Sequence, residues 1–166
     1  MAQGHDTVHM ADTASADAVT DTLLAASRLL LGLSIRSIAT VDDSITIPQF
    51  RLLVVLGTRG PMKLAALADA LDVNPSTATR MIDRLTTAGL VDRQVNPASR
   101  REVVIDLTGA GGSTVARVMR QRRREIARVV ARMPGRHRTG LVEGLESFSE
   151  SGGEPPIDVA RTAEWI

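Results

Sequence analysis

The chain has 166 residues, of which 43% are hydrophobic and 23% are charged. This length and composition are typical of one globular domain and exclude a collagen-like or wholly disordered chain. Because the sequence has no cysteine, disulfides, thiolate metal sites and cysteine nucleophiles are excluded as well. No uninterrupted apolar run approaches the ~20 residues of a membrane span, and residues 1–20 lack both basic residues and an apolar core. We therefore expect a cytoplasmic protein with no membrane partner.

The net charge of +1 conceals an uneven distribution along the chain. Residues 51–138 carry 17 basic and seven acidic side chains, whereas residues 1–50 carry two and six, and residues 139–166 carry one and six. All the basic residues are arginines except Lys63, and a guanidinium is the better two-pronged donor to phosphates and guanines. A basic middle between acidic ends predicts a polyanionic partner.

The first half of the chain is predicted to be helical. Residues 1–16 show no period and are expected to form a tail, and a helical apolar pattern then extends over residues 17–41. A second helix is expected to begin after Thr46, which forms a capping box with Gln49, and to end at Gly57. A short alanine-rich helix over residues 63–71 follows.

The next helix has the strongest start signal in the sequence. Asn74 is an N-cap residue and Pro75 occupies the first helical position, so a helix is expected from there through Ala88. Its apolar residues recur at i, i+3, i+4 and i+7, which defines one buried face. These inward-facing residues are Ala78, Met81, Ile82 and Leu85. The polar residues between them are left on or near the outer face.

After this helix the hydrophobic period changes from helical to alternating. Residues 90–95 and 102–107 are predicted to be strands joined by a hairpin loop, residues 96–101, that carries Arg100 and Arg101. Thr108 is expected to cap a long helix that extends to Met133, and a last helix extends to about residue 149. The fold is therefore expected to be mainly α with a small antiparallel β wing.

A helix, a tight turn, a second helix and a basic hairpin form the winged helix-turn-helix arrangement, which places one helix in the major groove of DNA. Thr79 and Arg80 are the best candidates to read bases, because Arg bonds guanine and the Thr methyl contacts thymine. Arg100 and Arg101 on the wing suit the minor groove. The residues predicted to contact DNA are Lys63, Ser76, Thr77, Thr79, Arg80, Arg84, Arg100 and Arg101.

Some basic residues keep a second interpretation open. Arg84 and Arg93 either contact DNA or pair internally, with Asp83, Asp92 or Glu102 for instance. The long helix carries seven arginines that are solvated, pair with an acidic helix of a second copy, or contact phosphate. These residues are Arg117, Arg120, Arg122, Arg123, Arg124, Arg128 and Arg132.

No catalytic or metal-binding motif appears. The sequence has no Gly-x-Ser-x-Gly or His-Glu-x-x-His motif, so we expect a protein that is not an enzyme. His5 and His9 have the spacing of a helical metal pair but lie in the predicted tail. Residues 109–114 are glycine-rich but lack the Lys of a phosphate-binding loop, so no cofactor is expected. Phe50 and Phe148 are expected in the core.

Several short motifs resemble the MarR family (multiple antibiotic resistance regulators) over roughly residues 17–150. They lie in residues 64–68, 76–85, 89–93 and 107–111. The resemblance implies a homodimer formed by the first helix (residues 17–41) and the last two (residues 109–150), with the winged helix-turn-helix at about residues 46–108 and a linker and tail at residues 151–166. It also implies a repressor that binds a pseudo-palindromic operator and is released by a small aromatic or lipophilic ligand.

The wing departs from the family pattern. The family commonly has Asp-x-Arg-Asp-x-Arg at the tip, whereas this chain keeps only the last arginine, Arg101, and has Ala98 in place of the first. The resemblance further places an effector pocket near Arg36, Phe50 and Leu53. The alternative function is a winged-helix dimerisation or protein-interaction module that binds no specific DNA. Such modules tend to lose the arginines that this chain retains on its recognition helix and wing.

Overall fold

The computed structural model describes residues 14–96 and 99–153, without the side chains of residues 96 and 99–102. The predicted tails therefore lie outside it apart from residues 14–16 and 151–153, as do His5, His9 and Trp165. The described chain divides at Gly32 into two units. The first contains the N-terminal part of α1 (Ala16–Val41), and the second contains the end of that helix and everything after it.

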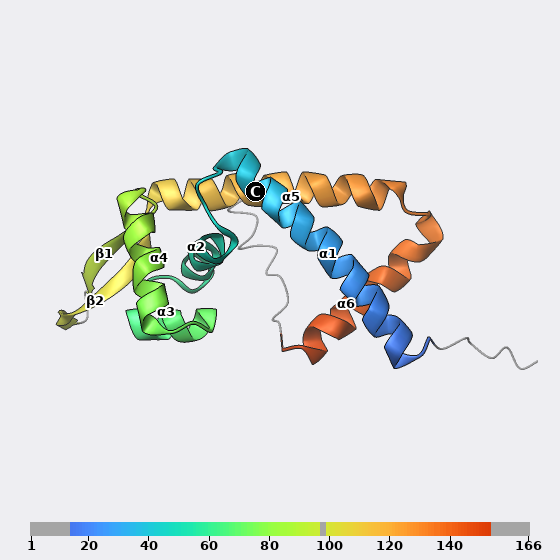
Figure 1. The fold of residues 1–166 in the computed structure, drawn as a ribbon, viewed down its shortest axis with the longest axis horizontal. Coiled ribbons are helices and arrows are strands. Elements are labelled where there is room, and N and C mark those ends of the chain that lie inside the picture. Colours follow the sequence, from blue (N-terminus) through green and yellow to red (C-terminus); the bar gives the residue numbers. More distant parts are fainter. Residues whose placement is uncertain (1–13, 97–98, 154–166) are drawn as a thin grey trace, which may run out of the picture. The chain divides into compact units, whose positions relative to one another are not determined.

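In the second unit, the end of α1 is followed by three short helices (Figure 1). They are α2 (Ile47–Arg59), α3 (Leu64–Leu71) and α4 (Pro75–Thr87). The predicted capping box is present, because the Gln49 backbone N–H donates to the Thr46 hydroxyl and the Gln49 side chain accepts from the Thr46 backbone N–H. The prediction that α2 ends at Gly57 is wrong. The helix continues to Arg59, and Gly60 ends it at a φ of 78°, a conformation that glycine adopts without strain.

The wing is an antiparallel hairpin of β1 (Val91–Asn96) and β2 (Ser99–Leu107). Strand β2 begins three residues earlier than predicted and β1 is shifted by one residue, since the ladder continues past Val95–Val103 to a last pair, Asn96 and Ser99, after a register irregularity. Arg100 and Arg101 therefore lie in strand β2, and the prediction that they lie in the connecting loop is wrong. An isolated bridge between Met62 and Ile105 ties the segment before α3 to the wing.

The long helix α5 (Gly109–Arg132) follows the wing directly. Thr108 caps it as predicted, by accepting from the Gly111 backbone N–H at 3.0 Å. A short 3-10 turn, η1 (Gly135–His137), leads into α6 (Arg138–Ser151). Inward-facing residues Val115 and Val118 of α5 are fully buried, which makes the first half of α5 part of the same core as the winged helix.

That core is built from one apolar stripe of each neighbouring element. Its members include Ile38, Phe50, Leu52, Leu53, Leu56, Leu67, Leu71, Ile82, Leu85, Val91, Ile105, Val115 and Val118. Phe50 lies in it as predicted, with 3% of its surface exposed, but Phe148 is 56% exposed and is no core residue. A single chain thus buries the winged helix well and leaves α6 without cover, because α6 has no buried residue.

Among the helices in the described ranges, only α1 is long and apolar enough to cross a membrane by length and composition. Polar residues interrupt the apolar residues of α1, so the sequence contains no uninterrupted apolar run as long as a membrane span. The mean hydropathy of the helix is nevertheless high enough for one. Only 6% of the apolar window is buried. A helix whose apolar face packs against a second protein chain has the same property.

Candidate nucleic-acid interface

The N-terminus of α4 is built by the side chain of Asn74. Its Oδ1 accepts from the backbone N–H of Thr77 and from the hydroxyl of Ser76, both at 2.8 Å. Pro75 fills the first helical position, where its missing N–H breaks no hydrogen bond. The first turn of α4 is therefore fixed, and it presents short polar side chains at the positive end of a helix dipole, where phosphates bind well.

The two faces of α4 are those predicted from its periodicity. Ala78, Met81, Ile82 and Leu85 are buried, and Ser76, Arg80, Asp83 and Arg84 are exposed. Thr77 and Thr79 are half-buried at the edge between the faces. The structure thus brings Ser76, Thr77, Thr79 and Arg80 together on two successive turns of one helix, and the major groove is wide enough to admit an α-helix.

The two base-reading candidates, Arg80 and Thr79, each donate one hydrogen bond within α4. The Arg80 Nη2 donates to the Thr77 Oγ1 at a long 3.4 Å, so its guanidinium lies over the first turn. The Thr79 hydroxyl donates to the Pro75 carbonyl at 2.9 Å, which occupies its proton within the helix. Arg80 thus keeps most of its five N–H donors for another acceptor.

An ion pair connects α4 to the wing. The Nη2 of Arg93 on β1 lies 2.5 Å from the Oδ1 of Asp83 on α4. Of the three acids that the sequence offered to Arg93, the structure pairs it with Asp83. Both side chains are about half exposed, at 45% and 53%, so solvent screens the pair and its stabilising effect is small. Its geometric effect is to fix the hairpin relative to the helix.

The remaining predicted contact residues lie around this pair. Lys63 is exposed at the N-cap position of α3. Arg84 is exposed near the end of α4, where it lines a cleft of about 220 Å³ with residues of the α1–α2 connection and the start of α2. Arg100 and Arg101 lie on β2 next to the hairpin end, and their side chains are outside the described ones.

Sequence reasoning did not identify an apolar pair on the wing. Val95 and Val103 stand directly opposite each other and are 58% and 54% exposed. Alternation correctly grouped Val103 with Ile105 and Leu107 on one face. The alternation does not predict that Val95 and Val103 are exposed, because their exposure depends on how far α4 covers the hairpin.

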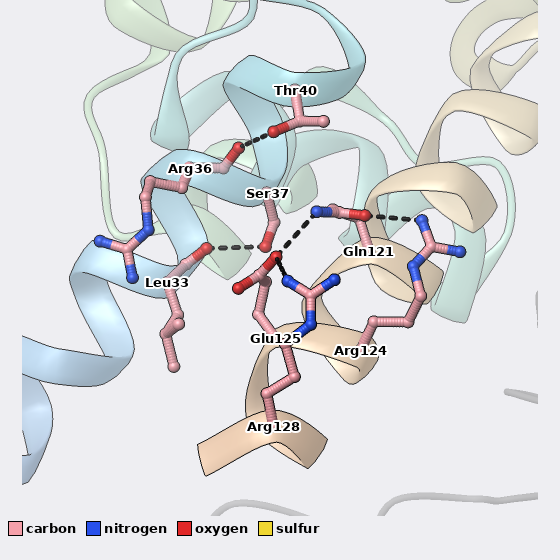
Figure 2. Close-up of polar contacts among 8 residues, drawn as sticks. All are labelled: Leu33, Arg36, Ser37, Thr40, Gln121, Arg124, Glu125 and Arg128. Carbon is pink, nitrogen blue, oxygen red and sulfur yellow. Dashed lines mark hydrogen bonds and ion pairs between the residues drawn. The ribbon is translucent and has the colours of Figure 1, made fainter.

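The residues predicted to line an effector pocket are not gathered around an opening. Phe50 and Leu53 are buried in the core, whereas Arg36 is exposed and points away from α5 (Figure 2). Neither of the two clefts described is lined by any of the three. The larger cleft, about 440 Å³, lies where the end of α2 meets the start of α5.

A different arginine lies against Phe50. The guanidinium carbon of Arg122 on α5 is 5.3 Å from the centroid of the Phe50 ring, which is cation–π distance. Its Nε is buried and has no hydrogen-bond partner. Desolvation by burial lowers the pKa of Arg122 below its usual value, because the charged form loses water without gaining a carboxylate.

The next turns of α5 carry a polar network (Figure 2). Gln121 donates to the carboxylate of Glu125 at 3.0 Å, and Arg128 donates to the same Glu125 oxygen at 2.8 Å. Arg124 donates to the amide oxygen of Gln121 at 2.6 Å, and Arg117 reaches the Val41 carbonyl at 3.4 Å. Several of the α5 arginines thus interact within the chain. No group of three His, Asp or Glu in the described ranges is arranged to hold a metal.

A capped recognition helix with a polar outer face, an ion-paired hairpin beside it and a buried core beneath both define a winged helix-turn-helix protein. Comparison with known proteins supports this assignment. The model of the MarR family matches residues 45–103. The crystal structure of RV1404 from Mycobacterium tuberculosis superposes with a TM-score of 0.79 and 52% identity, and the match covers 87% of this chain and 99% of that one.

The curated relatives of the chain include HTH-type transcriptional regulators. The HTH-type transcriptional regulator MT0903.1 from Mycobacterium tuberculosis is 31% identical over 111 residues, 67% of this chain and 76% of the relative. The HTH-type transcriptional repressor MdtR from Bacillus subtilis is 31% identical over 89 residues, 54% of this chain and 57% of the relative. The chain belongs to the MarR family. It is therefore a transcriptional regulator of a DNA-binding family, as its sequence predicted.

Proposed function

We propose that this protein is a homodimeric repressor that binds a pseudo-palindromic operator through α4 and the wing. The observation that carries the proposal is the outer face of α4, where Arg80 lies over a fixed first turn beside a wing held by the Asp83–Arg93 pair. A module that had lost DNA binding would have no need of these exposed arginines. MdtR, a relative named as a repressor, supports the direction of control.

The proposed division of labour follows the grooves of B-DNA. Thr79 and Arg80 read base edges in the major groove, and Arg100 and Arg101 enter the minor groove. Ser76, Thr77, Lys63 and Arg84 hold the backbone phosphates, which fixes the register of the helix without reading sequence.

Dimerisation is proposed from the apolar surface that one chain leaves open. Large apolar side chains are exposed along α1 and α6: Val19, Leu24, Leu29, Leu30, Leu31 and Ile35, and Leu141, Val142, Leu145 and Phe148. Two helices with this much exposed apolar surface need a partner in water. A second copy provides it with two-fold symmetry, and two-fold symmetry places two recognition helices on the two halves of a palindrome.

The proposed DNA-binding and dimerisation roles also define the proposed domain organisation. Residues 46–108 form the DNA-binding module, residues 17–41 and 109–150 form the dimerisation region, and residues 1–16 and 151–166 flank them. A protein that acts on the genome in this way works in the cytoplasm, where it is nucleoid-associated when bound to DNA.

A small anionic aromatic effector is the second part of the proposal. Arg122 supports it, because its buried, unpartnered Nε and its position over Phe50 leave a desolvated cation without an acid. A ligand carboxylate beside Arg122 would offset that desolvation. A thermal-shift screen with aromatic acids, on wild type and on Arg122→Gln, tests this part. The absence of any shift in wild type would contradict it.

The principal test is DNA binding by fluorescence anisotropy, with duplex from upstream of the protein's own gene and a scrambled duplex, over a salt series. The expected result is a preference of severalfold or more for the upstream duplex, with an affinity that falls steeply as salt rises. Weak binding that ignores sequence would favour the alternative, a dimerisation or protein-interaction module. Footprinting of the bound duplex would then show whether protection covers two half-sites.

A further inference from the structure

The inner face of the wing carries a row of paired residues that runs from α5 toward the hairpin end. Cross-strand partners share a face, and residues two apart along a strand share it too. The row therefore consists of the pairs Val91–Leu107, Arg93–Ile105 and Val95–Val103. Because Arg93 reaches Asp83, this is the face turned toward the recognition helix α4.

Burial changes abruptly along that row. Val91 and Ile105 are 1% and 3% exposed, and Arg93 is held by its ion pair. One step farther, Val95 and Val103 are more than half exposed, because α4 no longer covers the hairpin there. An exposed β-branched pair on a thin hairpin costs solvation free energy that a polar pair of the same shape, such as two threonines, would avoid.

The size and the position of the Val95–Val103 pair indicate which class of macromolecule it contacts. Two valines on a hairpin offer far less than the roughly 800 Å² that each side of a stable protein interface buries, so a protein partner does not fit. Duplex DNA does, since its groove walls are lined by deoxyribose carbons that accept small apolar contacts. The pair is also continuous with the exposed face of α4 through the Asp83–Arg93 link, and Arg100 and Arg101 follow within the same hairpin.

We propose that Val95 and Val103 are DNA-contacting residues that pack against the deoxyribose edge of the groove entered by the wing. This inference rests on the proposed function, because it assumes that α4 and the wing face the duplex. It adds an apolar, sequence-independent contact to a set that is otherwise polar. In this arrangement the valines seat the hairpin by excluding water, while the neighbouring arginines supply charge.

The test replaces each valine by threonine, which keeps the β-branched shape and strand propensity while making one branch polar. DNA affinity is measured by anisotropy on the upstream and the scrambled duplex for Val95→Thr, Val103→Thr and the double variant. The expected loss is roughly threefold for each single change and about tenfold for both, from the apolar area that returns to water. The loss should be the same on both duplexes, because a sugar contact reads no base.

The salt series distinguishes this contact from a charged one. Valine neutralises no phosphate, so the slope of log Kd against log salt should stay at the wild-type value, whereas Arg100→Ala should reduce that slope by about 1. Gln94→Thr is the matched control, since Gln94 lies on the same strand but on the opposite face. It should bind DNA as the wild type does.

The outcomes separate this inference from the proposed function. Wild-type affinity in the double variant, with unchanged thermal stability, would overturn the valine contact alone. An equal loss in Gln94→Thr would also overturn it, because the effect would then reflect a general disturbance of the wing. Equal wild-type affinity for the two duplexes would overturn specific regulation, while a parallel loss on both in the valine variants would still support the contact.

Discussion

Arg80 is the side chain on which sequence discrimination is expected to depend most. Its guanidinium is exposed on the second turn of α4 and is held only by a 3.4 Å hydrogen bond to Thr77, so it is free to form a two-pronged bond with guanine. Arg80→Ala should cost about 1–3 kcal/mol of binding free energy and relax specificity at one base pair in each half-site. Selection of binding sequences from a randomised half-site measures both effects.

Arg101→Ala is the matched comparison at the wing. Minor-groove and phosphate contacts depend on charge rather than on a base pattern, so this variant should weaken binding with little change in preferred sequence and lower the salt slope by about 1. Equal and sequence-independent losses in both variants would contradict the assignment of base reading to Arg80.

The Asp83–Arg93 pair is expected to matter for DNA binding more than for stability. Both side chains are about half exposed, so neutralising either should change the free energy of unfolding by no more than about 1 kcal/mol. Arg93→Gln should weaken DNA binding because the hairpin loses its fixed position. In an Asp83→Asn background the same change should have little further effect, because the pair is already broken.

A double-mutant cycle in DNA-binding free energy measures this coupling. If Arg93 instead contacts phosphate directly, its loss will add to that of Asp83→Asn and will also reduce the salt slope by about 1. That result would contradict the positioning role and restore the other interpretation that the sequence left open.

At the scale of elements, the junction between the wing and α5 depends on one glycine. A Cβ on Gly111 would lie 2.1 Å from the Leu90 carbonyl oxygen and 2.8 Å from the Leu107 Cδ1, and backbone cannot move aside as a flexible side chain does. Gly111→Ala should therefore lower the free energy of unfolding by about 1–3 kcal/mol or more.

Gly112→Ala is its control, one residue along the same helix. The nearest atom to its Cβ would be the Leu107 Cδ2 at 3.9 Å, an ordinary contact, and alanine raises helix propensity by up to about 1 kcal/mol. Denaturant unfolding at one fixed protein concentration compares the two variants. A Gly111→Ala protein as stable as wild type would show that α5 is displaced from the wing without cost.

The ends of the helices show which boundaries the sequence predicts and which it does not. Caps are local, so Thr46, Asn74 and Thr108 marked three helix starts correctly. The C-terminal ends of helices are determined less by residues that are neighbours in the sequence. Gly57 looked like a stop, but the residue with a positive φ at the end of α2 is Gly60, three positions later. The close approach at Gly111 could not be predicted either, because residues 109–114 read as a glycine-tolerant helix start until Leu90 is placed against them.

For the whole molecule, the sequence does not predict which apolar surfaces are covered by a second chain. Phe148 is one of two phenylalanines in the chain and was expected in the core, yet it is 56% exposed. A hydrophobic stripe indicates that a face is covered, not whether the cover comes from the same chain. The effector site has the same limit. Arg122 lies against Phe50 across two helices, and no spacing along the sequence joins residues 72 positions apart.

The exposed stripe of α6 gives the prediction that tests the assembly. Leu145→Asp and Phe148→Asp place a carboxylate on an apolar face that has no buried residue in one chain, so folding of the winged helix should be retained. A dimer interface built on that face would bury the new charge at a cost of several kcal/mol. Both variants should therefore dissociate to monomers at micromolar concentration in analytical ultracentrifugation.

The monomers should also lose most of their affinity for a full operator while keeping that for a half-site, because the two recognition helices no longer bind as one unit. Ser147→Asp is the matched control, since it adds the same charge to an exposed polar position of the same helix that helical spacing places on the face away from Leu145, and it should remain dimeric. Monomeric wild-type protein, or dimers in both apolar-face variants, would contradict assembly through α6. Tight operator binding by a proven monomer would show that one winged helix suffices for recognition.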